Sequence, residues 1–142
     1  MHLTSFSDYA LRLLLYAAER PERLITIEEA ATAYEISRTH LTKVANHLTR
    51  TGFMKAVRGR SGGLMLARPA EAIRLGEVLR ATEPDFVIVE CFGDMEACNL
   101  SPSCRLRGVI SDAFASFFET MDRHTIHDLL ADPQRARPPT AA

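Results

Sequence analysis

Residues 37–68 constrain the fold of this chain more than any other stretch, because a strong charge bias and two structural patterns coincide there. This basic segment carries seven of the 17 Lys and Arg residues and none of the 18 Asp and Glu residues, although the formal net charge of the whole chain is only −1. Positive charge concentrated in this way is typical of a surface that binds a polyanion such as nucleic acid. A solvated basic face without a partner is the alternative.

The first structural pattern is a pair of helices. Apolar residues at helical spacing predict a short helix over 26–34 and a second helix over 37–50, joined by a turn at Glu35 and Ile36. The second helix has a polar, basic outer face, and its inner face consists of Leu41, Val44, Ala45 and Leu48. Two helices joined by so tight a turn, the second of them basic, predict a helix-turn-helix.

The second pattern is a β-hairpin directly after these helices. Residues 53–57 and 64–67 each predict a strand, and the segment between them, 58–63, is rich in glycine and carries two arginines. A helix-turn-helix followed by such a hairpin is a winged helix. We therefore predict a mainly α fold with a winged helix-turn-helix DNA-binding domain and a long C-terminal dimerisation helix.

The predicted contacts with DNA lie at the start of the second helix and at the hairpin tip. A recognition helix reads base edges with its N-terminal residues, and arginines on a thin loop suit the negative potential of the minor groove. The predicted DNA-binding residues are Ser37, Arg38, Thr39, His40, Lys43, Arg58, Arg60 and Ser61. For His40, and for His47 on the same outer face, a plain surface histidine is the alternative.

Helices are also predicted on either side of this unit. One spans 5–18, with Ser5 and Asp8 as a capping box, and a second spans 73–82. A long helix that ends near residue 123 carries an apolar, aromatic stripe too wide for solvent, which predicts an interface with a second copy of the chain. The expected organisation is a DNA-binding domain over 1–69, a cluster-binding loop and dimerisation helix over 70–131, and a disordered tail over 132–142.

Composition favours a soluble regulator over an enzyme. The 142 residues are 46% hydrophobic and 25% charged, and no run approaches the roughly 18 apolar residues that a membrane helix needs. The first residues have no signal-type apolar core, so we expect a cytoplasmic protein. No phosphate-binding GxxxxGK[ST] or GxGxxG motif occurs, which argues against a nucleotide-dependent enzyme.

All three cysteines of the chain, Cys91, Cys98 and Cys104, lie within fourteen residues. In the cytosol such a group is more often metal-binding or redox-active than a disulfide framework, and an odd count leaves one thiol over. Zinc sites usually use CxxC pairs, so the wider spacing here favours an iron–sulfur cluster over zinc. A helix capped by Ser101 would place Cys104 in its first turn, where the helix dipole lowers the pKa of a thiol.

Three cysteines leave a four-iron cluster one ligand short. No histidine lies in the cysteine loop, so the candidates for a fourth ligand are carboxylates. Glu90, Asp94 and Glu96 are close in sequence, and Asp8 is the distant candidate, with the capping box as its alternative role.

Taken together, these motifs resemble the NsrR/IscR superfamily of dimeric winged-helix iron–sulfur regulators. The resemblance rests on residues 3–12 in the first helix, 37–41 in the recognition helix, 57–64 in the wing and the loop that closes on Cys104. Within the superfamily the chain is most similar to the NsrR branch. The branch that regulates cluster biogenesis has a histidine three residues after the third cysteine, and here that position is Arg107.

The resemblance implies a transcriptional repressor that senses nitric oxide. Each subunit would carry one iron–sulfur cluster, with 4Fe–4S favoured over 2Fe–2S, held by Cys91, Cys98 and Cys104 and by Asp8 of the partner subunit. Nitrosylation of the cluster would release the homodimer from a palindromic DNA operator.

Three alternatives stay open from the sequence. A regulator of the same superfamily could sense iron supply or redox state through a 2Fe–2S cluster. An enzyme could use the cluster for electron transfer, although the small size and the basic segment argue against it. A thiol-based or metal-free DNA-binding protein is the third alternative.

Overall fold

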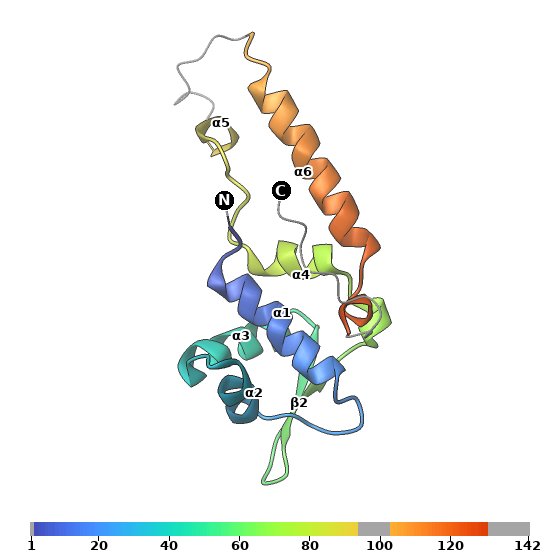
Figure 1. Ribbon diagram of the computed structural model, residues 1–142. Coiled ribbons are helices and arrows are strands. Elements are labelled where there is room, and N and C mark those ends of the chain that lie inside the picture. The colour runs from blue at the N-terminus through green and yellow to red at the C-terminus, as the bar shows by residue number, and fades with distance from the viewer. Residues whose placement is uncertain (1, 94–102, 131–142) are drawn as a thin grey trace.

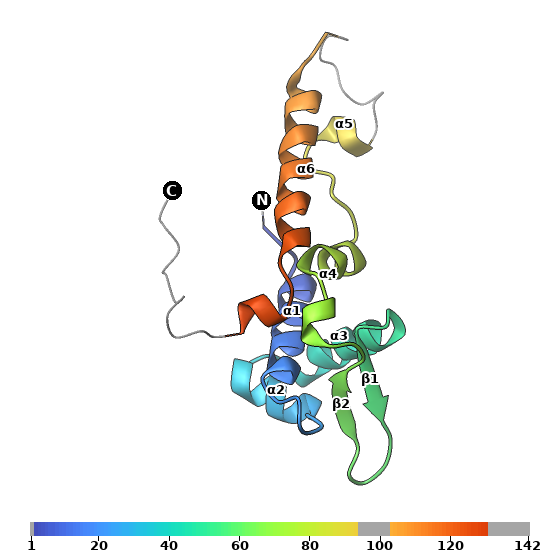
Figure 2. The same cartoon turned by 90° about the vertical axis from the view of Figure 1, so that its right-hand side faces the viewer.

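The computed structural model describes residues 2–93 and 103–130, whose elements pack around the first helix, α1 (Ser5–Ala18) (Figures 1 and 2). This helix is apolar on most sides, and Ala10, Leu13 and Leu14 are completely buried. It packs against α3, α4 and strand β2, so it lies between two surfaces, as a helix with so wide an apolar face must.

The N-terminal cap of α1 differs from the prediction. The cap is Thr4, whose hydroxyl accepts a hydrogen bond from the Ser7 amide at 3.3 Å, and the predicted capping box of Ser5 and Asp8 is wrong. The reason lies outside the helix. The Thr4 amide and hydroxyl both donate to the Glu83 carboxylate, at 2.9 and 3.0 Å, and these bonds hold Thr4 at the position before the helix.

The predicted helix-turn-helix is confirmed. Helix α2 (Ile27–Tyr34) begins at Thr26, whose hydroxyl accepts from the Glu29 amide at 3.1 Å. It ends at Glu35, which adopts the left-handed conformation at φ 55° and turns the chain into α3 (Arg38–Arg50). The predicted inner face of α3 is buried, with Leu41, Val44, Ala45 and Leu48 at most 2% exposed.

The predicted wing is also present. Strands β1 (Met54–Val57) and β2 (Gly63–Leu66) pair antiparallel, and Ile25 adds a single bridge to Leu64 on the far side of β2. The turn between the strands depends on glycine. Gly59 has φ 118°, and a side chain at Gly62 would collide with the Val57 carbonyl.

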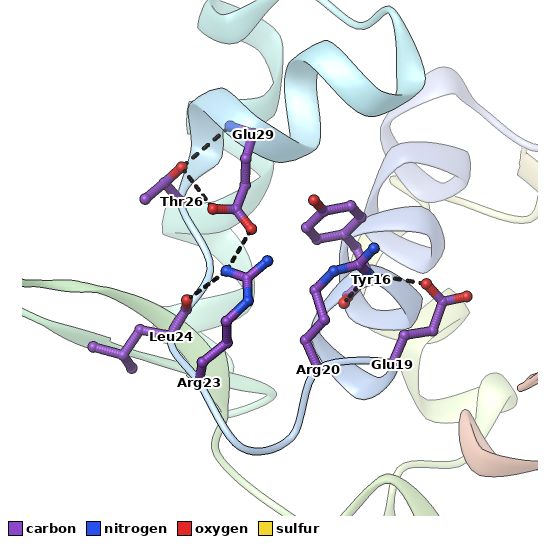
Figure 3. A network of polar contacts seen from close by, with 7 residues as sticks. All are labelled: Tyr16, Glu19, Arg20, Arg23, Leu24, Thr26 and Glu29. Carbon is purple, nitrogen blue, oxygen red and sulfur yellow. Dashed lines mark hydrogen bonds and ion pairs between the residues drawn. The ribbon is translucent and has the colours of Figure 1, made fainter.

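A polar network fixes the connection between α1 and α2 (Figure 3). Arg23 pairs with the Glu29 carboxylate at 2.8 Å, and the Arg20 guanidinium lies 3.7 Å from the centre of the Tyr16 ring. Burial raises the pKa of Glu29, but hydrogen bonding, first of all from Arg23, more than offsets this and lowers the pKa below its ordinary value. The network holds the connection in the course that brings Ile25 to the sheet.

After the wing come the short helix η1 (Ala70–Ala72) and α4 (Leu75–Thr82), which packs across α1. After α4 the chain passes through α5 (Glu90–Gly93) and returns as α6 (Leu106–Arg123) and η2 (His127–Leu129). In Figures 1 and 2, α6 extends away from the unit formed by α1 to α4 and the wing, and α5 lies beside its upper half. None of the helices in the described residues is long and apolar enough to cross a membrane.

The C-terminal end of α6 is attached to α4. Arg80 donates two hydrogen bonds to Asp122, at 2.7 and 2.8 Å, and its guanidinium lies 4.3 Å from the centre of the Phe118 ring. The hydrogen bond from Arg80 lowers the pKa of Asp122 below its ordinary value. The two helices approach so closely that a side chain at Gly76 would collide with the Asp122 carboxylate.

Candidate DNA-binding face and cysteine site

The start of α3 presents an exposed polar surface. Because Leu41, Val44 and Leu48 face the core, the residues on the opposite side of the helix are directed outward. Ser37 is the residue before the helix and makes no capping hydrogen bond through its side chain. The predicted DNA-binding residues of this helix are all exposed, namely Ser37, Arg38, Thr39, His40 and Lys43.

Arg38 has an acidic neighbour on α2. Its guanidinium lies 3.7 Å from the Glu28 carboxylate, and the two side chains are 73% and 74% exposed. An ion pair so long and so exposed is worth little in water. Arg38 can therefore exchange this partner for a phosphate at small cost.

The wing tip carries the other predicted residues. Arg58, Arg60 and Ser61 are all exposed, on a turn whose narrow shape depends on Gly59 and Gly62. In both views of the molecule the tip is the end farthest from α5 and from the start of α6 (Figures 1 and 2). The polar surface of α3 and the wing tip therefore belong to the same half of the molecule.

His47 does not lie on the outer face as predicted. Its Nε2 lies 2.6 Å from the Ala81 carbonyl oxygen, and its ring packs edge-on against Phe6 at 5.4 Å between ring centres. Helical periodicity gives the direction of a side chain, but here a neighbouring helix, α4, covers the edge of that face. His47 is half-buried, so it is not the plain surface histidine that was the alternative at this position.

Two of the three cysteines lie in the described residues. Cys91 is half-buried in α5, and Cys104 is exposed just before α6; both are free thiols. They flank residues 94–102 in the sequence, and both α5, which carries Cys91, and the start of α6 lie at the end of the molecule opposite the wing (Figure 1). Cys98, Asp94 and Glu96 lie outside the described residues, as does the side chain of Glu90.

The predicted start of the long helix is wrong. Helix α6 begins at Leu106, with Arg105 as the residue before it, and the Val109 amide donates to the Arg105 carbonyl at 3.1 Å in its first turn. Cys104 therefore precedes the helix instead of lying in its first turn. This leaves the Cys104 thiol exposed on a loop just before the helix.

Asp8 is in the first turn of α1, and its side chain is 46% exposed. Its carboxylate accepts from Arg12 Nε at 3.0 Å, one helical turn later. In Figures 1 and 2, α1 lies in the lower half of the molecule and α5 at the upper end. Within residues 2–93 and 103–130, no three His, Cys, Asp or Glu side chains come together as a ligand set for a metal.

Comparison with known proteins identifies the family. A family model named Rrf2 and described as an iron-dependent transcriptional regulator matches residues 3–132, which is nearly the whole chain. This chain belongs to the Rrf2 family. The assignment confirms the predicted superfamily and the prediction of a DNA-binding regulator instead of an enzyme.

Individual proteins are similar to this chain over nearly their full lengths. The HTH-type transcriptional regulator NsrR of Shouchella clausii (strain KSM-K16) is 41% identical over 139 residues, which cover 96% of this chain and 93% of that protein. A Listeria innocua protein of known crystal structure matches all of this chain and 96% of its own, with TM-score 0.80 and 23% identity. IscR of T. potens matches 97% and 93%, with TM-score 0.78 and 20% identity. These two structures confirm the predicted mainly α winged-helix fold.

Sequence reasoning missed the contacts that α4 makes with α1 and α3. Ser7 and Thr82 share a buried hydrogen bond of 2.8 Å although they are 75 residues apart. The only local signal is a polar residue on an otherwise apolar face of each helix. Such a residue indicates that a partner exists but does not identify it.

Proposed function

We propose that this Rrf2-family regulator is a homodimeric repressor that senses nitric oxide through an iron–sulfur cluster and releases a palindromic operator in response. One observation carries the proposal. Two free thiols, Cys91 and Cys104, flank one short segment at the end of the molecule opposite the wing. The 41% identity with a regulator named NsrR supports nitric oxide as the signal.

The reading end consists of α3 and the wing. Its exposed donors and cations suit phosphate oxygens and base edges, and the glycine-dependent tip suits the minor groove. The residues proposed to contact DNA are Ser37, Arg38, Thr39, His40, Lys43, Arg58, Arg60 and Ser61.

The proposed dimer interface is the apolar face of α6. None of the residues in this helix is buried in the single chain, and Leu106, Val109 and Phe117 are 48%, 63% and 41% exposed. An apolar face of this length needs a cover in water. Pairing of two α6 helices would provide that cover and would hold two reading ends on one operator, with recognition helices about one turn of DNA apart.

The proposed ligands of the cluster are Cys91, Cys98, Cys104 and Asp8 of the partner subunit. Thiolates are the usual donors to iron–sulfur clusters, and the two cysteines in the described residues are free for that purpose. The half-exposed Asp8 carboxylate is oriented by Arg12, and α1, which carries it, lies apart from α5 of the same chain in both views (Figures 1 and 2); this supports a ligand donated between subunits. When bound, the cluster supplies iron that nitric oxide can attack.

A second candidate is a sensor of iron supply or redox state that uses a 2Fe–2S cluster. The description of the Rrf2 family as iron-dependent favours it. The two candidates differ in cluster type and in the signal that releases DNA, so both can be tested with the same preparation.

The test uses protein purified without oxygen. Native mass spectrometry gives the cluster type, and an operator selected from random DNA serves as the probe in a fluorescence anisotropy titration. We expect a coloured protein with a 4Fe–4S mass that loses operator affinity on addition of nitric oxide, whereas Cys98→Ser should bind no cluster. A colourless protein with bound zinc would contradict both candidates. A 2Fe–2S mass, with release by oxidant or by chelator but not by nitric oxide, would favour the second candidate.

A further inference from the structure

The last turn of α4 contacts the recognition helix directly. The four final carbonyl groups of a helix have no partner within it, and one of these, the Ala81 carbonyl, accepts a hydrogen bond from His47 at 2.6 Å. Because a carbonyl oxygen cannot donate, His47 must carry its proton on Nε2. The ring is held from its other side by Phe6, so His47 is fixed between α1 and α4.

The next two residues of the same turn bind the start of α1. Thr82 shares a buried hydrogen bond with Ser7 at 2.8 Å, and the Glu83 carboxylate accepts from the amide and the hydroxyl of Thr4. These bonds fix the first turn of α1, which also contains Asp8. Three consecutive residues thus connect α4 to the recognition helix and to the turn that carries the proposed ligand.

The chain continues from this turn straight to the cysteine segment. Residues 84–89 lead to Cys91, and Phe86 in this stretch packs against Phe114 and Phe118 of α6, with ring centres 5.9 and 4.9 Å apart. A displacement of the cysteine segment therefore reaches the end of α4 through a short connection that is also attached to α6.

We propose that Ala81, Thr82 and Glu83 transmit the state of the cysteine segment to the recognition helix, with His47 as the positioning residue on α3. This inference rests on the proposed function for its signal, which is the state of the cluster. The contacts of Ala81, Thr82 and Glu83 do not depend on that proposal. A hydrogen bond of 2.6 Å is lost on a displacement of about 1 Å, since bonds between such groups do not extend beyond roughly 3.5 Å. When the turn moves, α3 either follows it or loses the contact, which provides two discrete states.

The first experiment measures the operator affinity of cluster-loaded and metal-free protein and takes the ratio of the two. We expect His47→Leu to bring this ratio about fivefold closer to one, the factor that one net hydrogen bond supports. His47→Gln retains an amide donor of similar reach and should keep the wild-type ratio. His124→Leu, at an exposed histidine beyond α6, is the matched control and should also keep it. A wild-type ratio in His47→Leu would overturn the inference.

The second experiment uses metal-free protein only and measures backbone amide exchange. Phe86→Ala releases residues 84–89 from α6, and we expect about fivefold faster exchange in the second half of α3, at residues 44–50. In a His47→Leu background the same change should have no effect there. Unchanged exchange in α3 on Phe86→Ala would overturn the inference whether or not the protein binds a cluster. Equal affinities of loaded and metal-free wild-type protein, in contrast, would contradict only the proposed sensing function.

Discussion

The reading end and the α6 end of this chain differ in what happens to their apolar side chains. In the reading end, Leu41 and Leu48 are completely buried in a core built by the chain itself. In α6, no residue is buried, and Val109 is 63% exposed. The apolar side chains of the first region are covered within the single chain, whereas the second region leaves apolar surface exposed.

Because of this difference, the two regions contribute to two different quantities, the free energy of folding and the free energy of association. Side chains in the reading end contribute to the folding of one chain, and side chains on α6 contribute to association. Substitutions in the two regions should therefore change different measurements, and the following predictions are ordered by the size of their expected effect.

The largest effect is expected in the core of the reading end. Leu48→Ala should lower the free energy of unfolding by about 3 kcal/mol, since it leaves a cavity at a completely buried site of α3. Urea denaturation followed by circular dichroism measures this change. The matched substitution Leu106→Ala, at a residue that is 48% exposed, should change the unfolding of dilute monomer by less than about 0.5 kcal/mol and raise the dissociation constant of the dimer instead. An equal loss of unfolding free energy in both variants would end the distinction between the regions.

A smaller effect is expected at the wing. Replacing both Arg58 and Arg60 by Ala should weaken operator binding about tenfold near 0.1 M salt and reduce the salt dependence by at most about two phosphate equivalents. A mobility-shift titration at several salt concentrations measures both quantities. Arg123→Ala removes a positive charge from the C-terminal end of α6 and should leave the salt dependence unchanged. Unaltered binding of the double variant would show that the wing does not contact DNA.

The smallest effect concerns the attachment between the two regions. The pKa of Asp122 is lowered in the folded protein, chiefly by its hydrogen bond with Arg80, so the pair stabilises the fold above the ordinary carboxyl pKa of 3.8. This contribution is lost as the pH falls from that value through the lowered pKa. Asp122→Asn should therefore be less stable than wild type at pH 6, and the difference should shrink at pH 3. Urea midpoints at the two pH values test this, with exposed Asp112→Asn as control. A difference that does not depend on pH would contradict the assignment.

The parts of the fold that depend on neighbours in sequence could be predicted. The cap of α2 involves Thr26 and Glu29, three residues apart, and the buried face of α3 follows from helical spacing alone. The cap of α1 could not be predicted, because Thr4 is held by Glu83, 79 residues away. The start of α6 could not be predicted either, because Ser101 and Pro102 form a local pattern typical of a helix start, whereas the helix begins at Leu106.

The same limit applies to the site. Exposed cations at the start of α3 and on a glycine turn are properties of single elements, so their placement could be predicted from the sequence. His47 could not be assigned, since its partner is a backbone carbonyl 34 residues further along, and every residue type has such a carbonyl. The cysteine spacing predicts a shared metal cofactor, but it does not identify a further ligand, because that residue need not be close to the cysteines in the sequence.

Gly76 has a geometric consequence that extends beyond its own contacts. The absence of a side chain at this position lets α4 and α6 cross in direct contact, with Asp122 against the backbone. Helix α6 has 18 residues and is about 27 Å long, so a tilt of about 5° at the crossing moves its far end by about 2 Å. A methyl group added at residue 76 would meet the Asp122 carboxylate and the Arg80 guanidinium, and would disturb the ion pair that attaches α6 to α4. The direction of this long helix is therefore fixed beside a residue that has no side chain.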